Sequence, residues 1–178
     1  MQGQKTGHNL ASYDVRQEDS AYLAGILAAH LTRTGTVDHL SGHRVRPGLK
    51  GRAAFVAGVA HAAPDVAVLT GFCGTQDDSR VTRAWADAEI KAGADVIFTM
   101  LNDARRGAIE ACRAGAARQI GNALDWVARA PDVFVASAMA RIDIGVERAI
   151  ADMAAGRVSK TSNVPVLVRT RRSISVRR

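Results

Sequence analysis

Apolar and polar residues follow two alternating periods along this chain, and the pattern predicts strands and helices in turn. Short apolar runs are typical of buried strands, whereas apolar residues spaced three and four positions apart predict helices. We expect helices over 19–33, 52–63, 105–114 and 142–154, with one more that stops at Gly93, and strands over 36–40, 66–72, 95–101, 119–121 and 133–137. This alternation predicts an α/β fold, a doubly wound, mostly parallel sheet with helices on both faces.

Two helices carry more detailed expectations. Asp19 or Ser20 is expected to cap the first helix, because short polar side chains bind free amides at helix starts. Asp77-Asp78 is likewise read as a cap, although an acid pair could also serve catalysis. The helix that stops at Gly93 has Trp85 on its apolar phase, together with Val81, Ala84 and Ala88, so these residues are expected to be buried.

Polar side chains gather where three of the predicted strands end. Gln76 follows the strand 66–72, Asn102 follows 95–101, and Asn122, Asp125 and Trp126 follow 119–121. Ligands of parallel α/β sheets bind beyond the carboxyl ends of the strands. Amide, carboxylate and indole groups there predict a cleft for a small polar ligand with a flat or sugar-like face. The alternative, that Asn102 and Asn122 only cap the next helices, stays open.

The motifs of catalysis and metal binding are missing from the sequence. No Gly-x-Ser-x-Gly elbow, Gly-Lys-Ser/Thr phosphate loop or Gly-x-Gly-x-x-Gly fingerprint is present. His30, His39 and His43 fall on different predicted elements, so they are expected to be surface or hydrogen-bonded histidines rather than zinc ligands. We therefore expect a binding protein that is not an enzyme, with no catalytic residues, no metal and no cofactor.

Composition and charge further limit the class of protein. The chain has 178 residues, 47% of them hydrophobic, which suits one domain or one domain with an appendage. The net charge of +7 belongs to residues 157–178, which hold seven basic residues and no acid. A solvated tail is the favoured interpretation, so no nucleic-acid partner is expected, although contact with nucleic acid or an anionic membrane is the alternative. One β-like run, Val164 to Val168, lies within it.

Targeting segments and cysteines add little. The start of the chain lacks the apolar region of a signal peptide, and no apolar run is long enough to span a membrane. Cys112 falls on a helical apolar phase and is expected in the core, whereas Cys73 follows a strand end near the predicted cleft. Whether the two cysteines pair stays open.

Six segments, taken together, resemble a known family. SAYLAGILAA, TRTGTVDHLSG, GRAAFVAGV, GADVIFTMLND, IGNALDW and SAMARIDIGVERAIADMAAG follow the order and spacing of the basic membrane protein family over residues 9–156. Its members are substrate-binding components of ABC transporters with the type 1 periplasmic-binding-protein fold. The resemblance implies a nucleoside-like or sugar-like ligand, an ABC permease as partner, and an extracytoplasmic, membrane-anchored location.

The resemblance also implies a domain layout and roles. Residues 1–18 would be a lead-in, 19–140 the ligand-binding lobe (the C-terminal lobe of the family), 141–156 a helix of the other lobe, and 157–178 a basic tail. The chain would then be a fragment lacking most of the N-terminal lobe, with a hinge near Ser137–Arg141 and self-association through helix 142–154. Asn102 and Asp125 would orient ligand hydroxyls, Trp126 would stack on the ligand, and Gln76 and Asn122 would assist.

Two other classes remain as alternatives. A ligand-sensing regulatory domain of the same fold would be supported by an upstream helix-turn-helix. A small α/β enzyme would be supported by turnover of a nucleoside or sugar.

Overall fold

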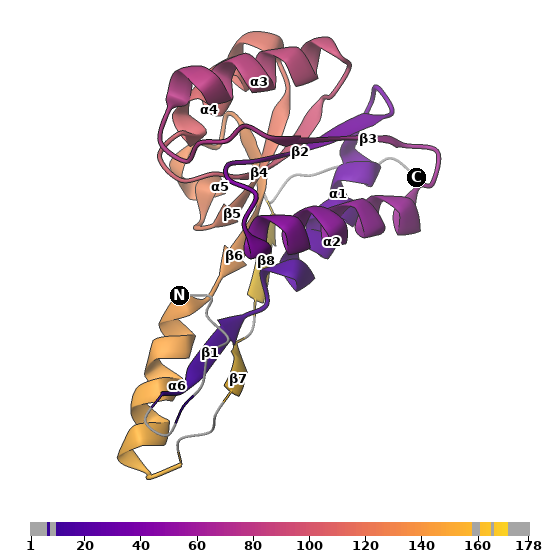
Figure 1. The fold of residues 1–178 in the computed structure, drawn as a ribbon. Helices are drawn as coiled ribbons and strands as arrows, with labels where there is room; N and C mark the ends of the chain where they lie inside the picture. The colour runs from indigo at the N-terminus through magenta and orange to yellow at the C-terminus, as the bar shows by residue number, and fades with distance from the viewer. Residues whose placement is uncertain (1–6, 8–9, 158–160, 165, 171–178) are drawn as a thin grey trace.

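The computed structural model describes Gly7 and residues 10–157, 161–164 and 166–170, which form eight strands and six helices (Figure 1). The strands are β1 (Ser12–Val15), β2 (Thr36–Ser41), β3 (Ala67–Phe72), β4 (Val96–Met100), β5 (Arg118–Ala123), β6 (Phe134–Ala140), β7 (Thr161–Val164) and β8 (Val166–Thr170). The helices are α1 (Gln17–Leu31), α2 (Arg46–Ala62), α3 (Ser79–Lys91), α4 (Arg105–Gly115), α5 (Trp126–Arg129) and α6 (Ile142–Ala154).

The main sheet has six strands in the order β3-β2-β4-β5-β6-β8. Neighbours from β3 to β6 run parallel, and β8 pairs antiparallel with β6 at the edge. Parallel neighbours need crossover connections, which the helices between the strands supply. The predicted doubly wound, mostly parallel sheet is confirmed. All five carboxyl ends of the parallel strands therefore meet at one edge.

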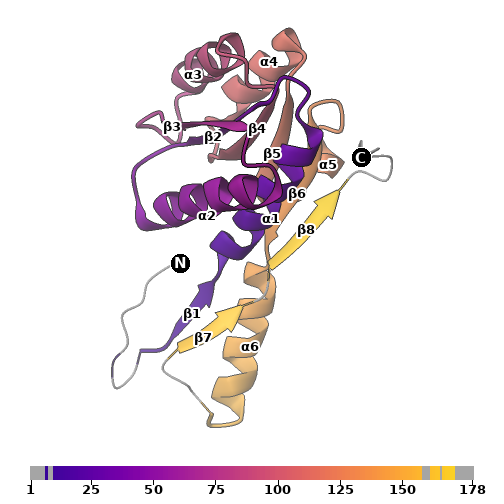
Figure 2. The same ribbon diagram turned by 90° about the vertical axis from the view of Figure 1, so that its right-hand side faces the viewer.

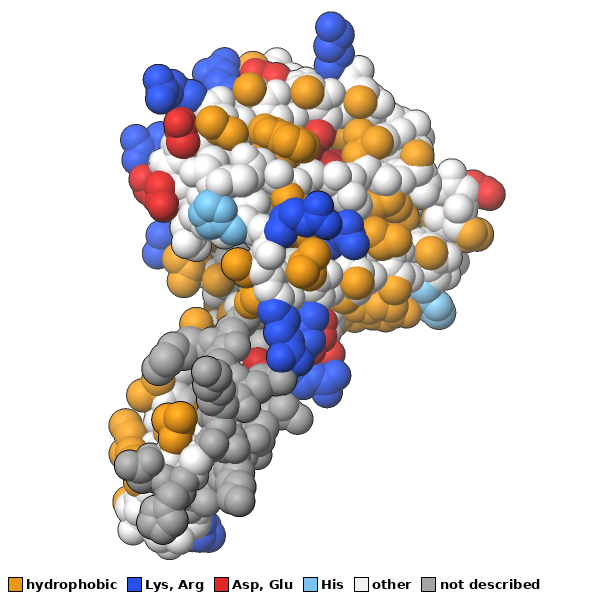
Figure 3. Space-filling model, in the orientation of Figure 1, with side chains coloured by type: hydrophobic (Ala, Val, Ile, Leu, Met, Phe, Trp, Pro, Cys, Tyr) orange, Lys and Arg blue, Asp and Glu red, His pale blue; other side chains and the backbone are white. Residues whose placement is uncertain are grey.

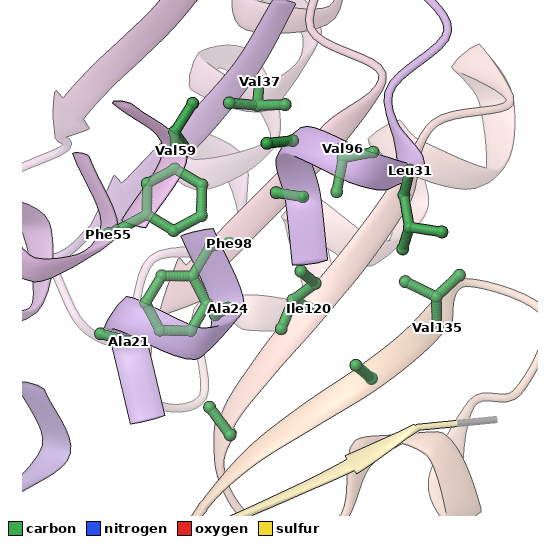
Figure 4. Packing of buried hydrophobic residues seen from close by; sticks show 14 of the residues in the cluster. Ala21, Ala24, Leu31, Val37, Phe55, Val59, Val96, Phe98, Ile120 and Val135 are labelled. Carbon is green, nitrogen blue, oxygen red and sulfur yellow. The ribbon is translucent and has the colours of Figure 1, made fainter. Parts of the chain in front are cut away.

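Helices cover both faces of this sheet, and each face has its own apolar core. Successive residues of a strand point to opposite faces, so Val37 of β2 joins the α1–α2 side and Leu40 joins the α3–α4 side. Figure 4 shows the first core, where Phe55 of α2 stacks on Phe98 of β4 at 5.4 Å between ring centres. Helices α1 and α2 touch through Gly25 and Gly58, since a Cβ there would lie 2.2 and 2.1 Å from the facing carbonyl oxygens.

A second, two-stranded parallel sheet pairs β1 with β7 outside the main body. Helix α6 packs against these two strands and extends below the main sheet (Figures 1 and 2). The chain passes between the two sheets from β1 to α1, from β6 to α6, and again between β7 and β8. Helix α6 has the predicted bounds, 142–154, but its assignment to another lobe stays a prediction.

The expectation of a solvated tail over 157–178 is wrong for two segments. β7 pairs with β1, and β8 extends the main sheet beside β6. The β-like run Val164 to Val168 overlaps both strands. The high density of basic residues favoured the interpretation as a tail. A strand at a sheet edge is held by backbone hydrogen bonds, which can form whatever the charge of its side chains.

Three local expectations need correction. The predicted apolar face of α3 is not buried: Trp85 is 40% exposed, Ala84 and Ala88 are exposed and Val81 is half-buried, because the helix buries Thr82, Ala86 and Glu89 instead. The first helix begins at Gln17, and Ser20 donates to the Gln17 carbonyl within the first turn rather than capping it. Helix α2 begins at Arg46, six residues before the predicted start at Arg52, with Pro47 in its first turn, where a missing amide hydrogen costs nothing.

Two other expectations are met, the cap of α3 and the burial of Cys112. Asp78 caps α3 by accepting from the amides of Arg80 and Val81. Cys112 is fully buried, and both cysteines are free thiols. In the part of the chain that the structure describes, no helix is long and apolar enough to cross a membrane.

Candidate ligand-binding site

A pocket of about 420 Å³ opens at the carboxyl ends of β4 and β5, in front of the first turns of α4. Its lining shares one feature, since apolar walls surround a few polar groups: Leu101, Asn102, Asp103, Arg105, Arg106, Ile109, Asn122, Ala123, Leu124 and Trp126. Small-molecule sites have this composition and size. The pocket lies at the edge of the sheet that the order of the strands predicts for a ligand.

Arg105, the first residue of α4, forms a wall of this pocket and is only 2% exposed. Its guanidinium donates to the Thr99 carbonyl and hydroxyl, the Leu101 carbonyl and Asn122 Oδ1, while Nε has no partner among the described residues. Burial lowers the pKa of Arg105 to about 9, so the group still carries its charge at neutral pH. The wall of the pocket therefore contains a desolvated cation.

The orientation of the Asn122 amide follows from this contact. A guanidinium can only donate hydrogen bonds, so the atom of Asn122 that faces Arg105 is Oδ1. The Nδ2 hydrogens are then directed away from Arg105, on the side chain that lines the pocket. Asn122 thus offers the pocket a donor, and its backbone carbonyl accepts from the Trp126 indole at 3.0 Å.

Asn102 lies at the pocket mouth, and Gln76 supports it from behind. Gln76 Oε1 accepts from the Asn102 amide at 3.0 Å, and the Gln76 carbonyl accepts from the Ala104 amide at 2.9 Å. Both bonds tie the loop after β3 to the turn between β4 and α4. Gln76 is absent from the lining that the described residues form, so it positions Asn102 rather than facing the pocket.

Trp126 and Asp125 both contact other protein groups, which limits how each can contact a ligand. The Trp126 ring has the Arg105 guanidinium 4.5 Å from its centre and the Phe134 ring 5.5 Å away, and it presses on Gly121. The indole therefore lines the pocket while packing on protein groups. Asp125 accepts from the Ala128 amide at 3.2 Å and caps α5; it is not among the described residues that line the pocket.

The strand-end prediction thus brings three of its five residues to one pocket. Asn102, Asn122 and Trp126 line it, Gln76 supports it, and Asp125 caps the neighbouring helix. Ala123, also in the lining, adopts a left-handed backbone with φ of +66°. A residue with a side chain rarely holds this conformation, which indicates that the turn after β5 is held in place by its surroundings.

The two basic residues of the described lining, Arg105 and Arg106, were not singled out by the sequence pattern. They follow Asn102-Asp103 at the start of a helix whose first turn holds no acid. Acids are favoured in a first turn because the helix dipole is positive there, so this reversal was the available signal.

The histidines do not form a metal site within the described part of the chain, where no group of three or more suitable ligands is found. His39 contradicts the expectation of a surface or hydrogen-bonded residue. It lies among Phe55, Phe72 and Phe98, and neither ring nitrogen has a partner among the described residues. Burial lowers the pKa of His39 to about 4, so the ring is neutral at pH 7.

The fold is an α/β unit of the type 1 periplasmic-binding-protein kind, with a candidate pocket at its strand ends. A solute-binding protein of an ABC transporter from Aeropyrum pernix K1 is similar over 93% of this chain and 51% of its own, with a TM-score of 0.84 and 22% identity. A transcriptional activator of the comK gene from Bacillus halodurans is similar with a TM-score of 0.81 and 16% identity, over 95% of this chain and 61% of its own. These likenesses establish the fold.

The chain belongs to the Bmp family, whose model, described as ABC transporter substrate-binding protein PnrA-like, matches residues 1–166. Basic membrane protein D of Borreliella burgdorferi is 28% identical over 137 residues, and a purine-binding protein of Brucella abortus is 27% identical over 130 residues. The matches cover 76% and 73% of this chain but only 40% and 37% of those relatives. The matched segments therefore cover well under half the length of these curated relatives.

Proposed function

We propose that this chain carries a solute-binding surface of an extracytoplasmic substrate-binding protein that serves an ABC permease. The observation that carries the proposal is the pocket at the ends of β4 and β5, where an apolar wall surrounds Asn102, Asn122 and Arg105. None of the residues in its described lining is a serine, cysteine or histidine. This composition favours reversible binding over covalent chemistry.

The polar groups would divide the work between them. Asn102, exposed at the mouth, would bond a ligand hydroxyl through its side-chain amide, and Asn122 Nδ2 would donate to a ligand oxygen. The edge of the Trp126 indole and Leu124 would contact the apolar or flat part of the solute. Gln76 and Asp125 would act through the backbone segments they hold, since both lie behind the lining.

The affinity of this chain by itself should be low. A type 1 receptor encloses its ligand between two lobes, and a surface open on one side buries only part of the solute. We expect dissociation constants for nucleosides and neutral sugars above about 1 mM, which corresponds to roughly 4 kcal/mol or less of binding free energy. A technique that measures millimolar affinity is therefore required.

Protein NMR provides the test. The purified chain, with Trp85→Phe to leave one indole signal, is titrated with ribose, glucose, adenosine and uridine while the Trp126 indole and the amides of residues 101–106 and 121–126 are followed. We expect saturable shifts confined to these segments. Asn102→Ala should weaken them, whereas Asp77→Ala, an exposed change in the loop after β3, should leave them unchanged.

The same samples separate the competing functions. Proton spectra of the solute recorded over days should show no new product, and steady turnover would favour the enzyme alternative. If no solute, neutral or charged, shifts the pocket signals, the proposal is wrong.

A further inference from the structure

We infer that the pocket selects solutes carrying an oxyanion, a phosphate or a carboxylate, over their neutral counterparts. The inference rests on the proposed function and adds the charge of the ligand to it. It comes from one juxtaposition, in which a buried guanidinium, an outward-facing amide donor and the start of a helix all present positive charge to the same cavity.

The charge of Arg105 lacks a neutralising carboxylate. All its bonds within the described residues run to neutral oxygens, and its Nε–H has no acceptor. A buried charge is normally paired, because water no longer solvates it. Asp103, the only acid in the described lining, points to solvent with 76% of its side chain exposed, so water weakens its field.

A second guanidinium lies at the rim. Arg106 also lines the pocket, is 69% exposed, and reaches Asp103 only at 3.8 Å. That distance is too long for a hydrogen bond, so Arg106 can turn to a ligand at little cost. A fixed cation in the wall and a mobile one at the rim suit the two sides of a bound oxyanion.

The uncharged groups of the pocket also present hydrogen-bond donors or partial positive charge. Asn122 gives its oxygen to Arg105 and is left with a donor on the pocket side. Helix α4, eleven residues long, begins at the pocket without a side-chain cap and without an acid in its first turn. The positive end of its dipole is therefore not offset by its own sequence, and an anion would stabilise it.

Arg105 also has a structural role, because it ties the end of β4 to Asn122 of β5. Neutral hydrogen-bonding groups could make that connection without the cost of a buried charge. A ligand that supplies the missing negative charge explains why a cation lies there. This distinction can be measured, since a purely structural arginine predicts no preference for charged solutes.

The test compares matched solutes by the NMR titration described above. The pairs are ribose with ribose 5-phosphate, adenosine with adenosine 5′-monophosphate, and glucose with glucuronate, so that phosphate and carboxylate are judged separately. We expect the charged member of at least one pair to bind about ten-fold or more tightly at low salt, as charge-assisted hydrogen bonds predict. Raising the salt concentration to about 0.3 M should reduce that ratio several-fold.

Variants assign the preference to the pocket. Arg106→Gln should lower the ratio by about three- to ten-fold without loss of the fold, because the residue is exposed. Arg80→Gln, which removes an exposed arginine at the start of α3, is the matched control and should not change it. Arg105→Met should abolish the preference; if this variant does not fold, Arg106→Gln and the salt series still decide.

The outcomes are distinct. Equal binding of charged and neutral partners would overturn the inference and leave the proposed function intact. Equal losses in Arg106→Gln and Arg80→Gln would also overturn it, because the attraction would then come from the whole molecule. Failure of every solute to shift the pocket signals would overturn both the inference and the proposed function.

Discussion

Replacing Glu89 by glutamine should change how the stability of this fold depends on pH. Glu89 of α3 is 7% exposed and lies over Gly71 of β3, beside the fully buried Asp38 of β2. Among the described residues, no hydrogen bond of good geometry reaches the oxygens of either carboxyl, and the backbone amide of His39 only partly offsets the burial of Asp38. A proton held between the two acids is the interaction that can satisfy both.

The direction in which the stability changes with pH follows from the pKa shifts of the two acids. Burial raises the pKa of Glu89 to about 7, and burial together with the neighbouring Glu89 raises the pKa of Asp38 well above its usual value. An acid with a raised pKa stabilises the folded state below its unfolded pKa, near 4.5, and loses that contribution as the pH rises through 7. A shift of about 2.5 pH units at roughly 1.4 kcal/mol each corresponds to about 3 kcal/mol.

His39 works in the opposite direction over much of this range. Because burial lowers its pKa to about 4, His39 stabilises the fold above pH 6.5 and loses that contribution as the pH falls towards 4. Because two acids with raised pKa values oppose a single histidine, His39 offsets only part of their effect, and the stability of the unmodified chain should fall as the pH rises from about 4.5 to 6.5. The thiols of Cys73 and Cys112 stay protonated throughout, since burial raises the pKa of each.

The useful quantity is the difference in unfolding free energy between Glu89→Gln and the unmodified chain, measured by urea denaturation from pH 4.5 to 8. The histidine contribution is common to both proteins and cancels. We expect the variant to gain about 3 kcal/mol relative to the unmodified chain over this range, because it has no buried glutamate to ionise. Asp87→Asn, a half-exposed acid on the same helix, is the control and should give a nearly flat difference.

A flat difference for Glu89→Gln as well would refute the reasoning. It would mean that Glu89 ionises in the fold as readily as in water, and therefore that the pair is not desolvated.

Two further predictions concern the parts of the chain outside the pocket. Helix α6 exposes an apolar stripe that includes Ile150, which is 58% exposed; orange side chains lie on the left of the lower body in Figure 3, where Figure 1 places α6. We propose that copies of the chain associate through this stripe, so Ile150→Asp should shift light scattering towards monomer, and Ala151→Asp, an exposed control, should not. Monomeric unmodified protein would contradict this. Deleting residues 158–178 removes β7 and β8 and leaves the edge of β6 unpaired. We expect the thermal midpoint to fall by more than about 5 °C. An unchanged midpoint would show that this pairing adds nothing to the stability of the fold.

Periodicity was sufficient to predict the order of the central elements. The helix at 142–154 and the strands that became β3 and β4 agree with their predicted positions within a residue or so. β4 is a short apolar run that is buried at every position, and such runs, like the three-and-four spacing of a helix, are visible in the sequence. Trp85 shows where this reasoning fails. Helix α3 turns Thr82, Ala86 and Glu89 inward, and Trp85 lies at the border of that face, where its ring contacts Gly71 of β3 and 40% of the residue remains exposed.

The strands β1, β7 and β8 could not be predicted in the same way, although β3, which is also at an edge, could. β1 and β8 each pair with a single neighbour, and such a strand is held by backbone bonds that depend weakly on which residues supply them. Its sequence can remain polar or basic, as between residues 157 and 178. Partners far apart in the sequence, such as Ser12 and Thr161, become visible only when the fold brings them together.

For the candidate site, the location could be predicted from the sequence, but the charge of the pocket could not. Its location depends on topology, since every loop that follows a parallel strand reaches one edge of the sheet, and Asn102 and Asn122 could be placed there from the order of elements alone. Its electrostatic character depends on Arg105, an apparently ordinary helix-start residue whose side chain folds under the sheet edge. An arginine at a first turn is normally solvated, so only the three-dimensional structure reveals that this charge is buried in the pocket wall. The position of the sheet edge predicts where a ligand binds, and the guanidinium without a carboxylate partner indicates that this ligand is negatively charged.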